Sequence, residues 1–426
     1  MTRKIWVLVI ANVLVSVILL EGQVFATDAA GPKKIVVFLD GISLADQQTA
    51  VAQSGSTVVQ PLPFINAWAI ALPVLTPDQA VAFLLNYTVA GVYIVAGVYD
   101  DLTVSVLPIT PALPGQVPVQ ETYDWGLVHS GVDVAHQEWP GVQGQGVNVA
   151  IVDTGIDCGH PDLPLFIDGF NALPGGVSYC DDHGHGTHIA GIIAARKNNA
   201  GLIGAAPLAS LVAVKVLDAK GKGYLSNLLF GLQWIYINQI QKQIRLVNMS
   251  LGFSVGSPPL QTAIEKLFYD HGTLMVAAAG NSCPSAGGQG ESGGDEGQGA
   301  CPQTTTVMYP AAYSVVLAVT ATDSNDQITD YSLAGSAVDV TAPGGVRKNK
   351  RILSTYLGGL YGFASGTSQA AAHVTGALAL KLQQRPALSL ADVRGLLQQT
   401  ATVLPGYPRT QQGRGLIDAE ALLAAP

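Results

Sequence analysis

The sequence has few charged residues and no excess of basic ones. Charged residues make up 12% of the 426 residues, and 30 acidic residues against 21 basic ones give a formal net charge of −9. A chain with this balance lacks the basic surface that nucleic-acid binding requires. Glycine, in contrast, is abundant, with 48 residues. The composition is typical of an exported globular protein and disfavours a nucleic-acid partner.

Cysteine is also scarce, with four residues at Cys158, Cys180, Cys283 and Cys301. No C-x-x-C pair is present, which makes zinc binding the weaker interpretation. Four cysteines allow three disulfide pairings, and the pairing of sequence neighbours, Cys158 with Cys180 and Cys283 with Cys301, fits an exported protein best. Each bridge would close a loop of about 20 residues and contribute on the order of 3 kcal/mol.

The N-terminus has the pattern of an export signal. Two basic residues precede an apolar run over residues 5–20, and Val24-Phe25-Ala26 supplies small residues suited to cleavage after Ala26. The run is short for a membrane span. We therefore expect residues 1–26 to be a signal peptide and the protein to be secreted, extracellular or periplasmic, without membrane association after cleavage. A membrane anchor is the alternative.

Residues 27–107 form a separate block of short strand and helix patterns, which predicts a small α+β domain of ferredoxin-like order. A generic α+β domain is the alternative. The expected strands cover 34–39, two segments within 56–72, 92–95 and 102–106, and the expected helices cover 44–54 and 77–85.

Residues 108–124 contain four prolines within eleven positions, at 108, 111, 114 and 118. Proline at this density favours extended backbone, so the segment is predicted to be an exposed linker. Because proteases cleave exposed extended chain most readily, we expect a maturation site between Leu107 and Trp125.

Residues 125–426 alternate apolar strand patterns with helical patterns. This alternation predicts a mostly parallel central sheet with helices on both faces. The expected strands cover 147–152, 210–216, 246–250, 274–278 and 315–319, and the expected helices cover 187–196, 225–240, 259–270, 369–383 and 417–423.

Three segments of this region carry side chains suited to nucleophilic catalysis. Ser368 stands where a loop of small residues becomes an alanine-rich helix, Asp153 ends a buried strand, and His185 enters another helix after a glycine-rich turn. A serine becomes a nucleophile when a base accepts its proton and a third group orients that base. A helix-capping role for Ser368 and a metal site at His183, His185 and His188 are the alternatives.

These segments resemble the signature motifs of the subtilisin-like serine proteases, the subtilase family. The matching motifs, in chain order, are Asp153-Thr154-Gly155, His185-Gly186-Thr187-His188, Ala277-Ala278-Ala279-Gly280-Asn281 and Gly366-Thr367-Ser368. The resemblance implies a subtilisin-like α/β fold, an Asp-His-Ser triad, and Asn281 as the side-chain donor to the oxyanion. It also implies that residues 27–107 are a propeptide that assists folding, inhibits the enzyme and is removed by the enzyme itself.

Further residues are assigned by the same resemblance. Two backbone segments, Gly221-Lys222-Gly223 and Ser250-Leu251-Gly252, match the edges that bind an extended polypeptide substrate. Met308 stands in the pocket for the side chain before the cut, where many members have glycine. Asp162 and Asn198 match a structural calcium site, although Asp162 could instead cap a turn. No organic cofactor is expected, and the protein is expected to be monomeric.

Other functions remain open. A peptidyl or acyl transferase could use the same triad, and a catalytically silent subtilase-like binding protein is a second alternative. The segment 284–300 is interpreted as an inert glycine-rich loop, with a gate over the site as the alternative.

Overall fold

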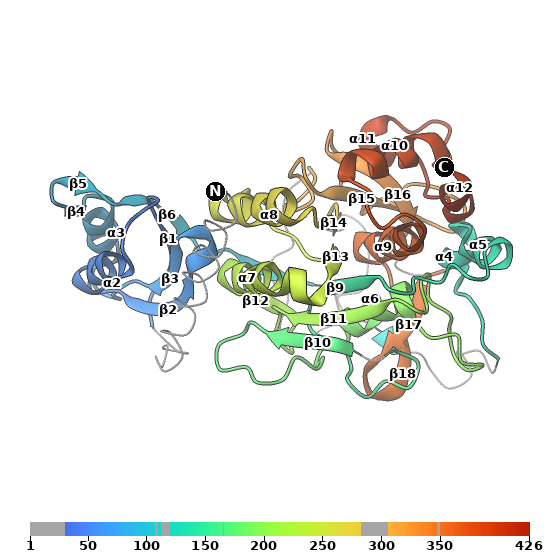
Figure 1. Cartoon of the computed structure of the whole chain (residues 1–426), viewed down its shortest axis with the longest axis horizontal. Helices are drawn as coiled ribbons and strands as arrows, with labels where there is room; N and C mark the ends of the chain where they lie inside the picture. Colours follow the sequence, from blue (N-terminus) through green and yellow to red (C-terminus); the bar gives the residue numbers. More distant parts are fainter. Residues whose placement is uncertain (1–29, 107–109, 112–119, 165, 283–305, 347–349) are drawn as a thin grey trace, which may run out of the picture. The chain divides into compact units, whose positions relative to one another are not determined.

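The computed structural model (Figure 1) describes residues 30–106, 110–111, 120–164, 166–282, 306–346 and 350–426. These form two compact units, one up to Leu102 together with Ser257–Ala263, the other containing Thr103–Gly256 and Ile264–Pro426. No helix in the described ranges is long and apolar enough to span a membrane. The predicted signal peptide, most of the predicted linker, Cys283, Cys301 and the segment 284–300 lie outside the described residues.

The N-terminal unit is an antiparallel sheet with two helices (Figure 1, blue). Its sheet has the order β2-β3-β1-β6, which with the alternation of strands and helices is the ferredoxin-like arrangement that the sequence predicts. The elements are β1 (Lys33–Phe38), α2 (Leu44–Gln53), β2 (Thr57–Leu62), η1 (Pro63–Ile65), β3 (Ala67–Ala71), α3 (Pro77–Leu85), β4 (Thr88–Val89), β5 (Val92–Tyr93) and β6 (Val95–Asp100).

Trp68 lies at the centre of this unit's core. Its side chain is 2% exposed, and its indole Nε1 donates to Gln47 Oε1 on α2 at 2.8 Å. One predicted strand differs from the structure: residues 92–93 form a hairpin with 88–89, and the fourth strand of the sheet begins only at Val95.

The second unit contains a sheet of seven strands, each parallel to its neighbours, in the order β10-β11-β9-β13-β14-β15-β16. Successive residues of a strand face opposite sides of a sheet, and strands such as β14 and β15 are buried at every position, so both faces are covered. The strands are β9 (Asn148–Asp153), β10 (Phe166–Asn171), β11 (Ser210–Lys215), β13 (Ile244–Met249), β14 (Leu274–Ala278), β15 (Leu317–Thr322) and β16 (Val338–Pro343).

Two buried helices pack against each other and against this sheet. Every residue of α6 (His185–Ala194) is buried, and α9 (Thr367–Gln384) is buried from Thr367 to Leu382. The other helices are α4 (Trp125–His129), α5 (Val132–Glu138), α7 (Leu225–Lys242), α8 (Pro258–His271), α10 (Leu390–Thr400), α11 (Arg409–Gln412) and α12 (Ala419–Ala424).

Short strands complete the second unit. β7 (Thr103–Ser105) pairs antiparallel with β12 (Lys222–Tyr224), so the last strand that the sequence predicts for the N-terminal domain does not join that domain's sheet. β17 (Ile352–Tyr356), the turn η2 (Leu357–Gly359) and β18 (Leu360–Ala364) form a hairpin, and β8 (Thr110–Pro111) pairs with the free edge of β18.

The helices α6 and α9 each bury a neutral histidine. Burial lowers the pKa of His188 to about 3 and that of His373 to about 4. Nearby, Asp124 accepts the N–H groups of Gly126 and Leu353, and burial raises its pKa to about 6. Both histidines are therefore structural.

We expect the protein to lose stability as the pH falls from about 6.5 to 4. Each histidine binds fewer protons folded than unfolded in this range, which destabilises the fold, while Asp124 has the opposite effect between about 6 and 4. Two histidines should outweigh one carboxyl. Thermal unfolding of His373→Gln in a Ser368→Ala background should show a shallower pH slope than Ser368→Ala alone, whereas the partly exposed His129→Gln should not. Equal slopes in all three would contradict the assignment.

Candidate active site

Asp153 lies fully buried at the carboxyl end of β9. Its carboxylate oxygens accept His185 Nδ1–H at 2.8 and 2.9 Å, and Oδ1 also accepts the N–H of Thr154 at 2.7 Å. A buried carboxylate is costly unless its oxygens are hydrogen-bonded, and these donors meet that need. The contact fixes the ring of His185 with Nδ1 protonated and Nε2 as the available acceptor.

His185 is the first residue of α6, and its position depends on the loop before it. Gly184 has a φ of 104°, and a Cβ there would lie 2.2 Å from the ring of Tyr356. Gly184 is the N-cap residue but has no side chain that could accept a hydrogen bond. Asp181 supplies the acceptor instead: its carboxylate accepts the N–H groups of His183, Gly184 and Thr187 at 2.9 to 3.0 Å. No role for Asp181 was predicted from the sequence, because it lies three residues before the N-cap position at which capping residues are recognised.

Ser368 is the second residue of α9 and is 8% exposed. Its Oγ donates to the carbonyl of Ser250 at 3.2 Å, and Ser250 Oγ donates back to the Ser368 carbonyl at 3.0 Å. Ser368 and His185 both lie in the described part of the chain, and no hydrogen bond joins them there. Asn248, buried on β13, donates to Ser250 Oγ at 2.9 Å and so anchors this pair to the sheet.

The sheet register brings these groups together. β9 and β13 are parallel neighbours, and Ile151 pairs with Asn248. Asp153 and Ser250 lie two residues beyond Ile151 and Asn248, so both stand at the same edge of the sheet. Asp153 holds His185, and Ser250 holds Ser368, at the carboxyl ends of the strands where sites in open α/β sheets usually form.

Asn281 follows β14 at the same edge. Its Oδ1 accepts the N–H of Thr367 at 3.0 Å and the hydroxyl of Thr367 at 3.1 Å. Because the oxygen is held in this way, the amide Nδ2–H₂ group is oriented as a donor beside the start of α9. Thr367 was not assigned a role from the sequence beyond its place in the motif.

Met308 packs against two glycines of the predicted substrate-binding region. It is 9% exposed, a Cβ on Gly280 would lie 2.6 Å from its Sδ, and a Cβ on Gly252 would lie 3.1 Å from its Cβ. Its thioether therefore occupies space between the segments that carry Asn281 and Ser250-Leu251-Gly252.

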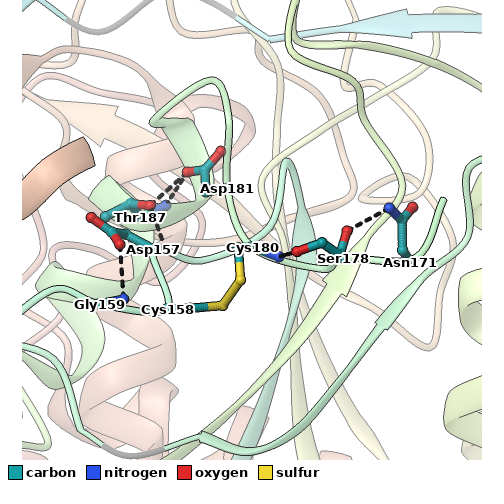
Figure 2. Close-up of a disulfide and its surroundings, with 8 residues drawn as sticks. All are labelled: Asp157, Cys158, Gly159, Asn171, Ser178, Cys180, Asp181 and Thr187. Atoms are coloured by element: carbon teal, nitrogen blue, oxygen red, sulfur yellow. Dashed lines mark hydrogen bonds between the residues drawn. A yellow bond between two sulfur atoms is a disulfide. The ribbon is translucent and has the colours of Figure 1, made fainter.

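A disulfide joins Cys158 to Cys180, across 22 positions of sequence (Figure 2). This pair confirms one of the two predicted bridges. Figure 2 shows the bridge beside Asp181 and Thr187, whose hydroxyl donates to Asp181 Oδ2 at 2.6 Å. It thus connects the segment after Asp153 with the loop before His185.

The three histidines considered for a metal site have separate environments. His188 Nε2 donates to the carbonyls of Ile352 and Gly362, while the rings of His183 and His185 lie 6.5 Å apart between centroids. Burial, with His185 nearby, lowers the pKa of His183. Among the described residues, no group of three or more His, Cys, Asp or Glu could hold a metal ion.

Asp162 and Asn198, the predicted calcium ligands, are in contact. Asn198 Nδ2 donates to Asp162 Oδ1 at 3.0 Å, and Asp162 Oδ2 accepts the N–H of Leu202 at 3.0 Å. A second carboxylate, Glu121, accepts the N–H groups of Asn198 and Asn199 at 2.5 and 2.7 Å. Two carboxylates and an amide thus meet at one loop. Glu121 was missed because it lies 41 positions before Asp162 in the sequence, within no recognisable motif.

Comparisons with known proteins identify the family of this chain. The profile of the subtilase family matches residues 144–416. Subtilisin E of Bacillus subtilis (strain 168) is 34% identical over 433 residues, covering 99% of both chains, and subtilisin of Bacillus pumilus is 41% identical over 302 residues, covering 71% of this chain and 98% of the relative.

Among solved structures, this chain resembles fervidolysin from Fervidobacterium pennivorans, a keratinolytic enzyme related to subtilisin. The TM-score is 0.74 at 26% sequence identity, and the match covers 95% of this chain. The chain spans 62% of the length of that structure. Taken with the family profile and the full-length relatives, the fold and the motifs show that this chain belongs to the subtilase family and is a subtilisin-like serine endopeptidase.

Proposed function

We propose that the protein hydrolyses polypeptides through Asp153, His185 and Ser368 by way of an acyl-enzyme. The observation that carries the proposal is the buried carboxylate of Asp153 on His185 Nδ1, at the sheet edge where Ser368 is held. When substrate binds, the Ser368 hydroxyl leaves the Ser250 carbonyl, gives its proton to His185 Nε2, and attacks the scissile carbonyl. His185 then protonates the leaving amine, and water releases the acyl group by the reverse path.

Asn281 is proposed to donate its amide Nδ2–H to the oxyanion, with the backbone N–H of Ser368 as the second donor. The Thr367 contacts to Asn281 Oδ1 support this role because they leave Nδ2 as the free donor. Loss of such a side-chain donor lowers turnover by about 10²–10³ in subtilisin itself.

Extended substrate is proposed to bind by strand addition to the edges at Gly221-Lys222-Gly223 and Ser250-Leu251-Gly252. The pairing of β7 with β12 supports this for the first edge, since Val106 N also donates to the Gly221 carbonyl at 2.9 Å. An extended strand of the protein's own chain thus pairs with the edge proposed for substrate.

We also propose that the protein is made as a secreted zymogen with a signal peptide (1–26), an inhibitory propeptide (27–107), a linker (108–124) and a catalytic domain (125–426). The β7–β12 pairing supports one part of this, the binding of the propeptide's last residues along the substrate edge. Residues 103–105 pair with β12, and residues 110–111 pair with β18. We propose that the active site cuts its own chain between these two paired segments, and that the freed propeptide then acts as an inhibitor.

A peptidyl transferase on the same triad remains the second candidate. It would pass the acyl group to an amine instead of water, so product analysis by mass spectrometry with an added amine distinguishes the two. A silent binding protein would release no peptides from a denatured protein mixture.

Maturation provides the first test. Ser368→Ala should fold but remain uncut, beginning near Thr27, because the nucleophile is missing. Wild type should yield a product beginning between Leu107 and Thr110, as read by N-terminal sequencing and intact mass. Ser254→Ala, at an exposed serine, is the matched control and should mature normally. Normal maturation of Ser368→Ala in the native host would contradict self-cleavage.

Substrate preference provides the second test. Because Met308 fills the space between Gly252 and Gly280, we expect cleavage after medium-sized apolar residues in preference to Arg, Lys or large aromatics. Met308→Gly should accept Phe and Tyr several-fold better. Met275→Ala, which removes a buried methionine from β14, controls for lost stability alone. The hypothesis is wrong if mass spectrometry of digests shows that the wild-type enzyme already cleaves preferentially after Phe or Tyr.

Calcium provides the third test. Glu121, Asp162 and Asn198 supply the oxygen-rich donor set that a hard cation prefers, so we propose a structural calcium ion at this loop. Chelator should then lower the Tm of the mature enzyme, and Asp162→Asn should remove most of that response. Asp218→Asn, at another loop of the same unit, should keep it. An unchanged Tm of wild type with chelator would refute the site.

A further inference from the structure

Lys215 is a buried cation that the proposed mechanism does not use. It is the last residue of β11 and is 2% exposed. An ammonium group has three N–H donors, and burying it is costly unless they are satisfied. All three are: Nζ donates to the Thr154 carbonyl at 2.6 Å, to the Leu217 carbonyl at 2.7 Å and to Asp182 Oδ1 at 2.7 Å.

The three acceptors belong to three different segments at the active-site edge of the sheet. Thr154 follows Asp153 directly, Leu217 follows β11, and Asp182 lies in the loop that leads into α6. In the register of the sheet, Lys215 is also the direct partner of Asp153. A single ammonium group therefore contacts the turn that carries one member of the triad and the loop that carries another.

Thr154 links these contacts to His185. Its N–H donates to Asp153 Oδ1, its carbonyl accepts from Lys215, and its hydroxyl accepts the N–H of Gly186, next to His185, at 2.9 Å. The N–H, the carbonyl and the hydroxyl oxygen of Thr154 each make a hydrogen bond at this site. A shift of the Thr154 carbonyl would move both the carboxylate and the start of α6.

We propose that Lys215 is a positioning residue, which through Asp182 holds the turn after Asp153 and the loop before His185 at a fixed separation. This inference rests on the proposed triad. Lys215 itself touches none of the groups that react, so its removal should act on turnover through geometry. Misplacing catalytic groups by about 1 Å can cost about 10²-fold in rate.

Asp182 offers the sharpest test because its side chain is 52% exposed, so its variants should fold. Asp182→Asn keeps an oxygen that can accept from Lys215, whereas Asp182→Ala removes the acceptor. The enzyme is expressed as the full-length chain, allowed to mature and assayed with a peptide substrate. We expect Asp182→Ala to lower kcat about tenfold with KM changed by less than about twofold. Asp182→Asn should stay within about threefold of wild type.

Lys215→Met removes the ammonium group at the centre of these contacts. With kcat calculated per titrated active site, Lys215→Met should lower kcat more than Asp182→Ala does. Lys242→Met is its matched control: Lys242 pairs with Asp168, and its own carbonyl accepts from Asn148 at the amino end of β9. Its kcat should match that of wild type. If Lys215→Met does not fold, the two Asp182 variants decide.

Equal kcat values for wild type, Asp182→Ala and Asp182→Asn would overturn the proposal, as would an equal loss in both variants. Failure of the triad assignment gives a different result. In that case Ser368→Ala keeps its peptidase activity, whatever the Asp182 variants do. An inactive Ser368→Ala together with a fully active Asp182→Ala would leave the triad standing and remove only the role of Lys215.

Discussion

The site depends on a carboxylate that is entirely buried. Asp153 has no exposed surface, so its charge must be balanced by groups that the fold supplies. The Thr154 N–H and the ring of His185 are those groups, and each can reach the carboxylate only if β9 ends and α6 begins in one relative position. The hydrogen bonds that stabilise the fold around Asp153 are therefore the same ones that set the geometry of the site.

Ser368 is tied to the fold in a different manner. Ser368 contacts Ser250, which in turn contacts Asn248. Thr375, seven residues after Ser368 on α9, donates to Asn248 Oδ1 at 2.8 Å. The serine is thus held by hydrogen bonds from a buried strand and from its own helix. Its hydroxyl, in contrast, makes a single bond of 3.2 Å to a carbonyl, which leaves it the most easily redirected group of the three.

Much of this arrangement could be predicted from the sequence because it is encoded locally. A buried apolar strand ending in Asp153, and small residues before the helices of His185 and Ser368, indicate both the elements and the side chains at their ends. The strands β10 and β16 at the two edges of the sheet were missed because polar residues or glycine interrupt their apolar runs, Asp168 and Gly169 in β10 and Asp339 and Thr341 in β16. The β17–β18 hairpin was missed as well. Contacts such as Lys215 with Asp182, or Glu121 with the Asn198 loop, depend on tertiary neighbours that no local pattern encodes. The partner of residues 103–105 was unpredictable for the same reason: a short strand does not specify which edge it will join.

The disulfide between Cys158 and Cys180 has one more consequence for an enzyme that digests polypeptides. Between the two cysteines lies a run of exposed residues, 174–178, in which Val177 is 97% exposed. Exposed loops of small residues are preferred sites of proteolytic nicking, and one protease molecule can cleave another of the same kind. A single autolytic nick in this run would separate the chain that carries Asp153 from the chain that carries His185. The bridge would keep both fragments covalently joined, so a nicked molecule could retain its fold at the place where an unbridged one would come apart.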